Sequence, residues 1–101
     1  MKSLLQSTSF QKWVSKLKDE RAKALIAARL NRLAAGNAGD VEPVGAGISE
    51  LRIHYGPGYR VYFVDAGAVL ILLLCGGDKS TQQSDIRRAK EIALEWRTEN
   101  G

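Results

Sequence analysis

An unbroken apolar run, AVLILLLC at residues 68–75, constrains the fold of this chain more than any other segment. A membrane-spanning helix needs roughly 20 apolar residues, so this run is far too short to cross a bilayer. Short apolar runs bounded by turn signals are typical of strands that are buried on both faces. Such signals are present, with the letters DAG before the run and GG after it. We therefore predict a buried strand at these residues.

Two further β-prone segments, residues 50–55 and 59–65, precede this run and are separated by the letters GPG. A glycine- and proline-rich spacer of this length is a strong signal for a hairpin turn. The three segments together predict an antiparallel meander. Residues 2–6 predict a short additional strand at the start of the chain.

Three segments have apolar residues at helical spacing. Residues 7–18 and 19–35 predict a helical hairpin with a basic outer face, and residues 81–98 predict a C-terminal helix. Residues 36–49, rich in glycine and without apolar periodicity, predict a surface loop. We therefore expect one α+β domain over residues 1–101, with an antiparallel β-sheet, an N-terminal helical hairpin and a C-terminal helix.

Composition and charge narrow the classes of function. With 45% hydrophobic and 26% charged residues, the chain has the composition of a globular protein and not of a disordered tail. Fifteen Lys and Arg against eleven Asp and Glu give a net charge of +4, which favours a polyanionic partner. The sequence has a single cysteine and no signal peptide, so we predict a cytoplasmic protein without membrane attachment. No group of residues has metal-ligand spacing, so we expect neither a metal nor a cofactor.

Alternation along the predicted hairpin places a polar patch on one face of the sheet, because side chains two residues apart share a face. If the strands pair symmetrically about the GPG turn, His54 lies opposite Arg60 and Arg52 lies opposite Tyr62. We expect this face to be open to solvent, and Arg60 to be exposed. Polar residues occupy the exposed face of many sheets whatever their function, so a purely structural explanation stays open.

The chemistry of this patch suits an RNA phosphodiester. Arginine forks can donate paired hydrogen bonds to phosphate oxygens and stabilise a pentacoordinate transition state. An imidazole can act as general base or acid near neutral pH. Lys79 precedes a predicted helix N-terminus, which itself attracts anions. The residues predicted to be catalytic are Arg52, His54, Arg60 and Lys79, and those predicted to bind RNA are Lys12, Lys16, Arg29, Arg32 and Tyr62.

The stretches SELRIHYGPGYRVYF and CGGDKSTQQSDIRRAKEIA closely resemble the addiction-module killer proteins, the HigB-like branch of the RelE/ParE toxin superfamily. The resemblance covers nearly the whole chain. It implies a microbial-RNase-like fold and the toxin of a type II toxin–antitoxin system, with a helix-turn-helix antitoxin as partner. It also implies metal-independent cleavage of mRNA in the ribosomal A site, by attack of the ribose 2′-OH on the adjacent phosphate. By position, Arg52, Arg60 and Lys79 match basic residues of the family.

The chain departs from this pattern near its C-terminus, where several RelE-type enzymes carry a Tyr or His that helps to activate the nucleophile. No Tyr or His follows Tyr62 in this sequence. Either His54 supplies the acid–base step, or the basic residues act by positioning and electrostatic stabilisation alone. Two alternatives therefore stay open: a ParE-like DNA gyrase poison of the same fold, and a non-catalytic RNA- or ribosome-binding module.

Overall fold

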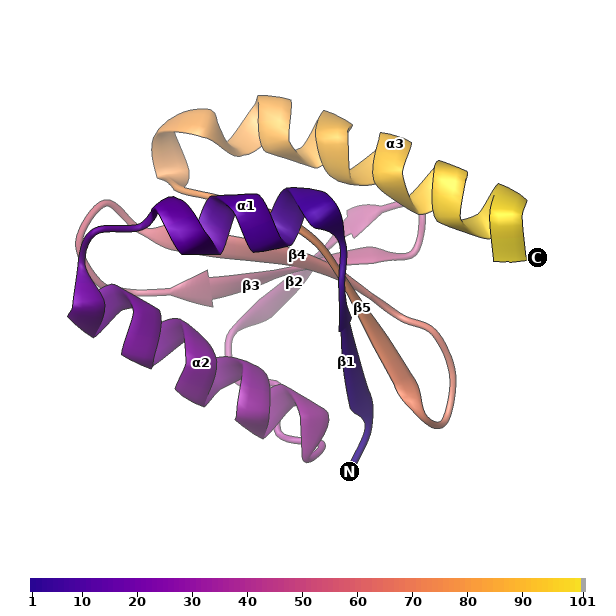
Figure 1. The fold of residues 1–101 in the computed structure, drawn as a ribbon, viewed down its shortest axis with the longest axis horizontal. Helices are drawn as coiled ribbons and strands as arrows, with labels where there is room; N and C mark the ends of the chain where they lie inside the picture. Colours follow the sequence, from indigo (N-terminus) through magenta and orange to yellow (C-terminus); the bar gives the residue numbers. More distant parts are fainter. Residues whose placement is uncertain (101) are drawn as a thin grey trace.

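The computed structural model describes residues 1–100 and contains a five-stranded sheet with three α-helices (Figure 1). The strands lie in the order β1-β5-β4-β3-β2, so the first strand of the chain lies beside the last. The strands β3, β4 and β5 form the predicted antiparallel meander, while β1 runs parallel to β5 at one edge. In chain order the elements are β1 (Ser3–Gln6), α1 (Thr8–Lys16), α2 (Glu20–Ala34), β2 (Val41–Gly45), β3 (Ile48–Ile53), β4 (Tyr59–Asp65), β5 (Leu70–Gly77), a 3-10 turn (Lys79–Thr81) and α3 (Gln82–Asn100).

The prediction of a surface loop over residues 36–49 is wrong, because this segment contains β2 and the start of β3. The strand β2 lies at the sheet edge and pairs antiparallel with β3. Its signal is weak in the sequence, since Glu42 and Pro43 are exposed and a bulge interrupts the pairing after Pro43. Proline is tolerated in a strand at an edge of this kind.

Helices cover both faces of the sheet, so the core has two layers. Val61 and Phe63 of β4 belong to the layer under α1 and α2, whereas Tyr62 and Val64 belong to the layer under α3. This division follows from the alternation of side chains along a strand. The strand β5 contributes to both layers, which confirms the prediction of a strand buried on both faces. Within the described residues, no helix is long and apolar enough to span a membrane.

Two glycines at the end of β5 allow the helices to approach the sheet closely. A Cβ atom at Gly76 would lie 2.2 Å from the ring of Trp13 in α1. A Cβ atom at Gly77 would lie 1.8 Å from the carboxylate of Asp85 in α3. Both distances are far shorter than a van der Waals contact, so a larger residue would force the Trp13 ring or the Asp85 side chain to move. The glycine pair thus leaves room for side chains of α1 and α3 at the end of β5.

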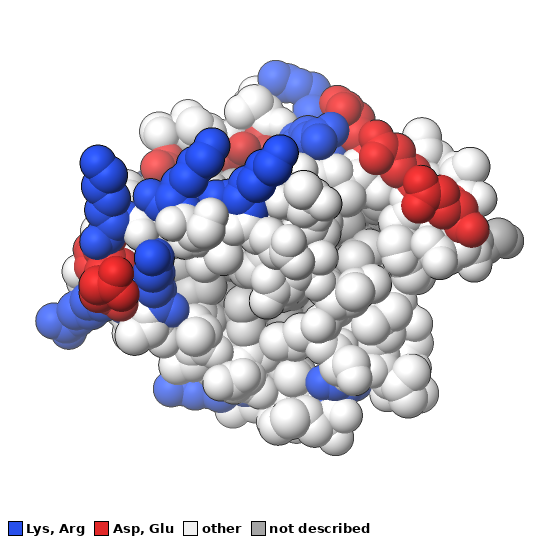
Figure 2. Space-filling model, in the orientation of Figure 1, with Lys and Arg blue, Asp and Glu red and all other residues white. Residues whose placement is uncertain are grey.

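Charged side chains are unevenly distributed over the surface. Figure 2 shows Lys and Arg side chains gathered over α1 and the start of α3, and acidic side chains along the C-terminal half of α3. Exposed Glu91, Glu95 and Glu99 follow one another at helical spacing in that half. The excess of positive charge is therefore concentrated away from the C-terminal end of α3.

Candidate active site

The loop between β3 and β4 borders a surface hollow of about 440 Å³, here called the hairpin cleft. Its lining includes the turn from Tyr55 to Gly58 and four charged or titratable side chains. These four are the residues that the sequence predicted to be catalytic: Arg52, His54, Arg60 and Lys79. The structure thus brings together side chains from β3, from β4 and from the turn after β5.

The turn glycines bring Lys79 to the hairpin cleft. Gly58 has a φ of +79°, a backbone conformation that glycine adopts without strain. A Cβ atom at Gly58 would lie 3.4 Å from the Cβ of Lys79, so the absent side chain leaves room for the lysine. The backbone N–H of Lys79 also points to the carbonyl oxygen of Pro57 at 3.4 Å. Two loops distant in the sequence are therefore held against each other.

The register of the hairpin differs from the predicted one. Arg52 lies opposite Arg60, Ile53 lies opposite Tyr59, and β3 ends at Ile53. The turn is wider than the GPG letters suggest, because the N–H of Tyr55 bonds to the carbonyl of Ile53 and the N–H of Gly58 to that of Tyr55. His54 consequently lies beyond the strand and not opposite Arg60. The two guanidinium groups, instead, come from directly paired positions.

The expectation that this face of the hairpin is open to solvent is also wrong. Arg60 is only 8% exposed and Tyr62 is fully buried, because α3 packs over this face. The Tyr62 hydroxyl donates a 3.0 Å hydrogen bond to Oε2 of Glu50. Burial, together with this bond, raises the pKa of Tyr62 well above its ordinary value. Tyr62 is thus part of the core and not a residue that contacts RNA.

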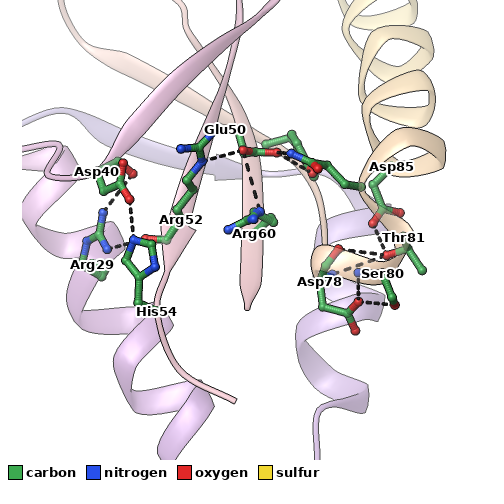
Figure 3. Close-up of polar contacts among 12 residues, drawn as sticks. Arg29, Asp40, Glu50, Arg52, His54, Arg60, Asp78, Ser80, Thr81 and Asp85 are labelled. Atoms are coloured by element: carbon green, nitrogen blue, oxygen red, sulfur yellow. Dashed lines mark hydrogen bonds and ion pairs between the residues drawn. The ribbon is translucent and has the colours of Figure 1, made fainter. Parts of the chain in front are cut away.

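A buried carboxylate, Glu50, connects the two arginines, and sequence reasoning missed it (Figure 3). Its Oε1 accepts a 2.9 Å hydrogen bond from Nε of Arg52 and lies 3.7 Å from Nε of Arg60. Its Oε2 accepts hydrogen bonds from Tyr62 and from Nε2 of Gln82, the latter at 2.7 Å. The alternation that places Glu50 on the same face as Arg52 is the signal that could have revealed it.

The ionised form of Glu50 is stabilised despite its burial. Desolvation raises the pKa of Glu50, but the hydrogen bonds from Arg52, Gln82 and Tyr62 together outweigh it, so the pKa lies below its ordinary value. The same contact raises the pKa of Arg52, chiefly through its hydrogen bond to Glu50. One negative charge is therefore fixed beneath two positive ones.

The terminal nitrogens of both arginines are free to bind a ligand. Among residues 1–100, no protein acceptor forms a hydrogen bond with an Nη nitrogen of Arg52 or Arg60. The Nε of Arg60 is also buried without a hydrogen-bond partner. Buried donors of this kind are rare in proteins, since they lose hydration without replacement. The Nη nitrogens therefore offer unused donors to an anion in the hairpin cleft, whereas the buried Nε of Arg60 faces Glu50.

His54 at the rim of the hairpin cleft is oriented by Asp40, a second residue that sequence reasoning missed. Nε2 of His54 lies 2.5 Å from Oδ2 of Asp40 (Figure 3). This hydrogen bond is the main cause of the lowered pKa of Asp40. Asp40 lies in the segment that was predicted to be a surface loop, and no sequence pattern there paired it with the histidine. Within the described residues, no three His, Cys, Asp or Glu side chains could together hold a metal ion.

The remaining residues predicted to bind RNA lie outside the hairpin cleft. Lys12 and Lys16 are exposed on α1, and Arg32 is exposed on α2. Arg29 is half-buried, and its guanidinium donates to the backbone carbonyls of Arg52, Ala38 and Asp40 (Figure 3). The structure therefore shows Arg29 fastening the segment before β2 to the end of β3.

The α+β fold is consistent with a RelE-like fold, and the family that the chain matches is a toxin-like family of the RelE/ParE type. Residues 12–97 match the family described as phage derived protein Gp49-like (DUF891), and the chain belongs to this family. An uncharacterised protein of Haemophilus influenzae is 58% identical over 87 residues, which cover 86% of this chain and 88% of that protein.

Proposed function

We propose that this protein is the toxin of a type II toxin–antitoxin system, of the HigB-like branch, and that it cleaves mRNA on the ribosome. Membership of the Gp49-like family supports the toxin part of the proposal. The pair Arg52 and Arg60 carries the nuclease part, because both line the hairpin cleft from directly opposed strand positions. Their free terminal nitrogens form two planar forks, which suit the oxygens of a phosphodiester.

The charge of the hairpin cleft favours a phosphate in its transition state. Lys79 adds a third positive group at the lining, and the nearest buried negative charge, Glu50, is shared between the two arginines. Fixed positive groups stabilise the extra charge that develops on the equatorial oxygens as the phosphorus becomes pentacoordinate. Since these groups are already in place, little reorganisation is needed during the reaction.

The reaction proposed is attack of the ribose 2′-oxygen on the adjacent phosphorus. A new O2′–P bond forms and the P–O5′ bond breaks, which yields a 2′,3′-cyclic phosphate and a 5′-hydroxyl. With Nε2–H of His54 donating to Asp40, Nδ1 is the ring nitrogen available to accept the proton of the 2′-hydroxyl. The leaving 5′-oxygen takes a proton from water.

The partners proposed are mRNA in the ribosomal A site and a helix-turn-helix antitoxin. A net charge of +4 suits an RNA partner. Exposed Lys12, Lys16 and Arg32 are proposed to contact RNA backbone outside the hairpin cleft. The ribosomal substrate implies action in the cytoplasm, and the proposed steps use no cofactor.

The test is single-turnover cleavage of mRNA on programmed ribosomes. Arg52→Ala is expected to slow cleavage by about a hundredfold, the usual loss when a transition-state donor is removed. Asp40→Asn is expected to slow it less, because His54 remains in place but loses its orienting carboxylate. Arg97→Ala is the matched control, since Arg97 is exposed on α3 beside Gly47, at the other end of β3 from the hairpin cleft.

Three results would contradict the proposal. A folded Arg52→Ala protein that cleaves at the wild-type rate would remove the arginine pair from the chemistry. Wild-type protein that leaves ribosome-bound mRNA intact but causes gyrase-dependent DNA breaks would favour the ParE-like alternative. Equal losses in Arg52→Ala and Arg97→Ala would mean that only overall charge matters, as expected for a non-catalytic binding module.

A further inference from the structure

A carboxylate that is fully shielded from solvent lies directly beneath the hairpin cleft. Glu50 is 0% exposed and connects three elements: its own strand β3, β4 through Arg60 and Tyr62, and α3 through Gln82. Taking a carboxylate out of water carries a large desolvation penalty even when the group is paired. Buried ion pairs of this type commonly add little or nothing to stability compared with apolar residues of the same size. The network therefore calls for an explanation other than stability.

The location of the two arginines provides that explanation. Like charges at directly opposed positions on neighbouring strands destabilise the pair, so Arg52 and Arg60 would turn away from each other without a counter-charge. Glu50 lies on the Nε side of both guanidinium groups. It neutralises part of their repulsion from below and leaves their Nη nitrogens unbonded.

The two arginines are held in different ways. Nε of Arg52 donates a hydrogen bond to Glu50 at 2.9 Å, whereas Nε of Arg60 lies at 3.7 Å and has no hydrogen bond to any group within residues 1–100. Arg60 is thus held by charge and packing. A neutral amide at position 50 could still accept the bond from Arg52 but would not attract Arg60 to the same degree.

We propose that Glu50 is the positioning residue of the hairpin cleft: its buried carboxylate holds Arg52 and Arg60 side by side with their terminal nitrogens directed at the scissile phosphate. This inference rests on the nuclease function proposed above. Glu50 does not touch the RNA. It acts through the two arginines, and Tyr62 and Gln82 fix its second oxygen so that the first stays on the guanidinium side.

The experiment compares Glu50→Gln with wild type in steady-state and single-turnover cleavage on programmed ribosomes. A positioning role predicts that kcat falls by about tenfold or more while KM changes less than about threefold, because misplaced groups lose contact with the transition state more than with the ground state. The matched control is Asp85→Asn, the same acid-to-amide change at a partly buried carboxylate that lies against Gly77 and contacts neither arginine. Its kcat should stay at the wild-type value.

A double-mutant cycle separates positioning from general loss of structure. If Glu50 acts through Arg60, which it holds by charge, then Arg60→Ala should reduce cleavage much less in the Glu50→Gln background than in wild type. Full additivity, or a kcat of Glu50→Gln equal to that of wild type, would overturn the proposal. So would a loss of kcat that Asp85→Asn reproduces at a matched loss of thermal midpoint.

A second variant covers the case in which Glu50→Gln does not fold. Gln82→Ala removes one hydrogen bond from Oε2 at the start of α3 and leaves both arginines intact. It should lower kcat by a few fold with KM unchanged, and an unchanged kcat would contradict the positioning role. If Arg52→Ala loses cleavage while Gln82→Ala keeps the wild-type kcat, the positioning role of Glu50 is wrong and the nuclease function stands. If Arg52→Ala cleaves at the wild-type rate, the proposed nuclease function itself is wrong.

Discussion

Arg52 and Arg60 occupy directly opposed positions on β3 and β4, so two guanidinium groups face the hairpin cleft from neighbouring strands. Opposed like charges are unfavourable unless a counter-ion offsets them. Here the counter-ion is Glu50, which lies on the buried side of both guanidinium groups, and their unbonded Nη nitrogens lie on the side of the hairpin cleft. The pair is therefore prepared for an anion before any ligand arrives.

Arg60 offers the sharpest test of function against stability. Because it is buried and close to Glu50, Arg60→Ala should destabilise the protein by about 1–3 kcal/mol through the carboxylate left behind. Arg60→Lys keeps the charge and should fold better, yet it lacks the two-pronged contact and should restore cleavage only in part. Thermal melting beside single-turnover cleavage measures both. Full cleavage by the lysine variant would exclude a bidentate role.

The pH dependence of stability should differ in sign for two carboxyl groups. The folded-state pKa of Glu50 lies below the ordinary 4.5, so its stabilising contribution is complete above about pH 4.5 and is lost as pH falls through the lowered pKa. Burial raises the pKa of Asp85 above the ordinary 3.8, so its contribution is largest at acid pH and declines as pH rises. Thermal midpoints from pH 3 to pH 7 should show an acid-side decline that Glu50→Gln makes shallower and Asp85→Asn makes steeper. Parallel curves for all three proteins would contradict this assignment.

Gly76→Ala should destabilise the protein by about 1–3 kcal/mol, because the added methyl group would overlap the ring of Trp13. Backbone conformation is not the cause, since Gly76 is not among the residues with positive φ. The double variant Gly76→Ala with Trp13→Leu should recover part of the loss. Chemical denaturation measures all three variants, and equal destabilisation with and without Trp13 would exclude the steric cause.

Cleavage should survive removal of divalent metal from the protein. The proposed steps use an imidazole and fixed positive side chains, so pre-treatment of the protein with EDTA followed by buffer exchange should leave its rate on intact ribosomes unchanged. A rate that falls after this treatment and returns when Zn²⁺ or Mn²⁺ is added to the protein alone would overturn the mechanism.

Binding of the antitoxin should depend on salt. An antitoxin that covers the hairpin cleft must meet Arg52, Arg60 and Lys79, so acidic groups are expected on its contacting surface, and the affinity should fall as ionic strength rises. Titration at several salt concentrations measures this. An affinity that does not change with salt would place the contact elsewhere, for example on an apolar surface.

Much of the fold could be predicted because local patterns determined it. The apolar run gave β5, and helical spacing gave α1, α2 and α3 to within two residues at each end. The edge strand β2 could not be predicted, since an exposed proline and a bulge hide its alternation. That α3 covers the polar face of the hairpin could not be predicted either, because its small residues Ala89 and Ala93 fit either face of a sheet.

The four residues predicted to be catalytic line one cleft, and their catalytic roles stay a prediction. Their arrangement differs from the predicted one, because the turn extends beyond the GPG letters and shifts the register. The partners Glu50 and Asp40 were missed for different reasons. Glu50 is buried by a helix from the end of the chain, and Asp40 reaches His54 across a connection that carries no repeating pattern.

The parallel pairing of β1 with β5 affects when the protein can fold during translation. Ser3 pairs with Leu70, so the strand β1 has no partner until residues 70–73 have been made. Contacts of such wide sequence separation form late in folding. Lys79 and Gln82 follow β5 and complete the cleft and its buried network. A nascent chain therefore lacks an assembled cleft until residues 79–82 have left the ribosome, so the nuclease proposed above could not act before that point.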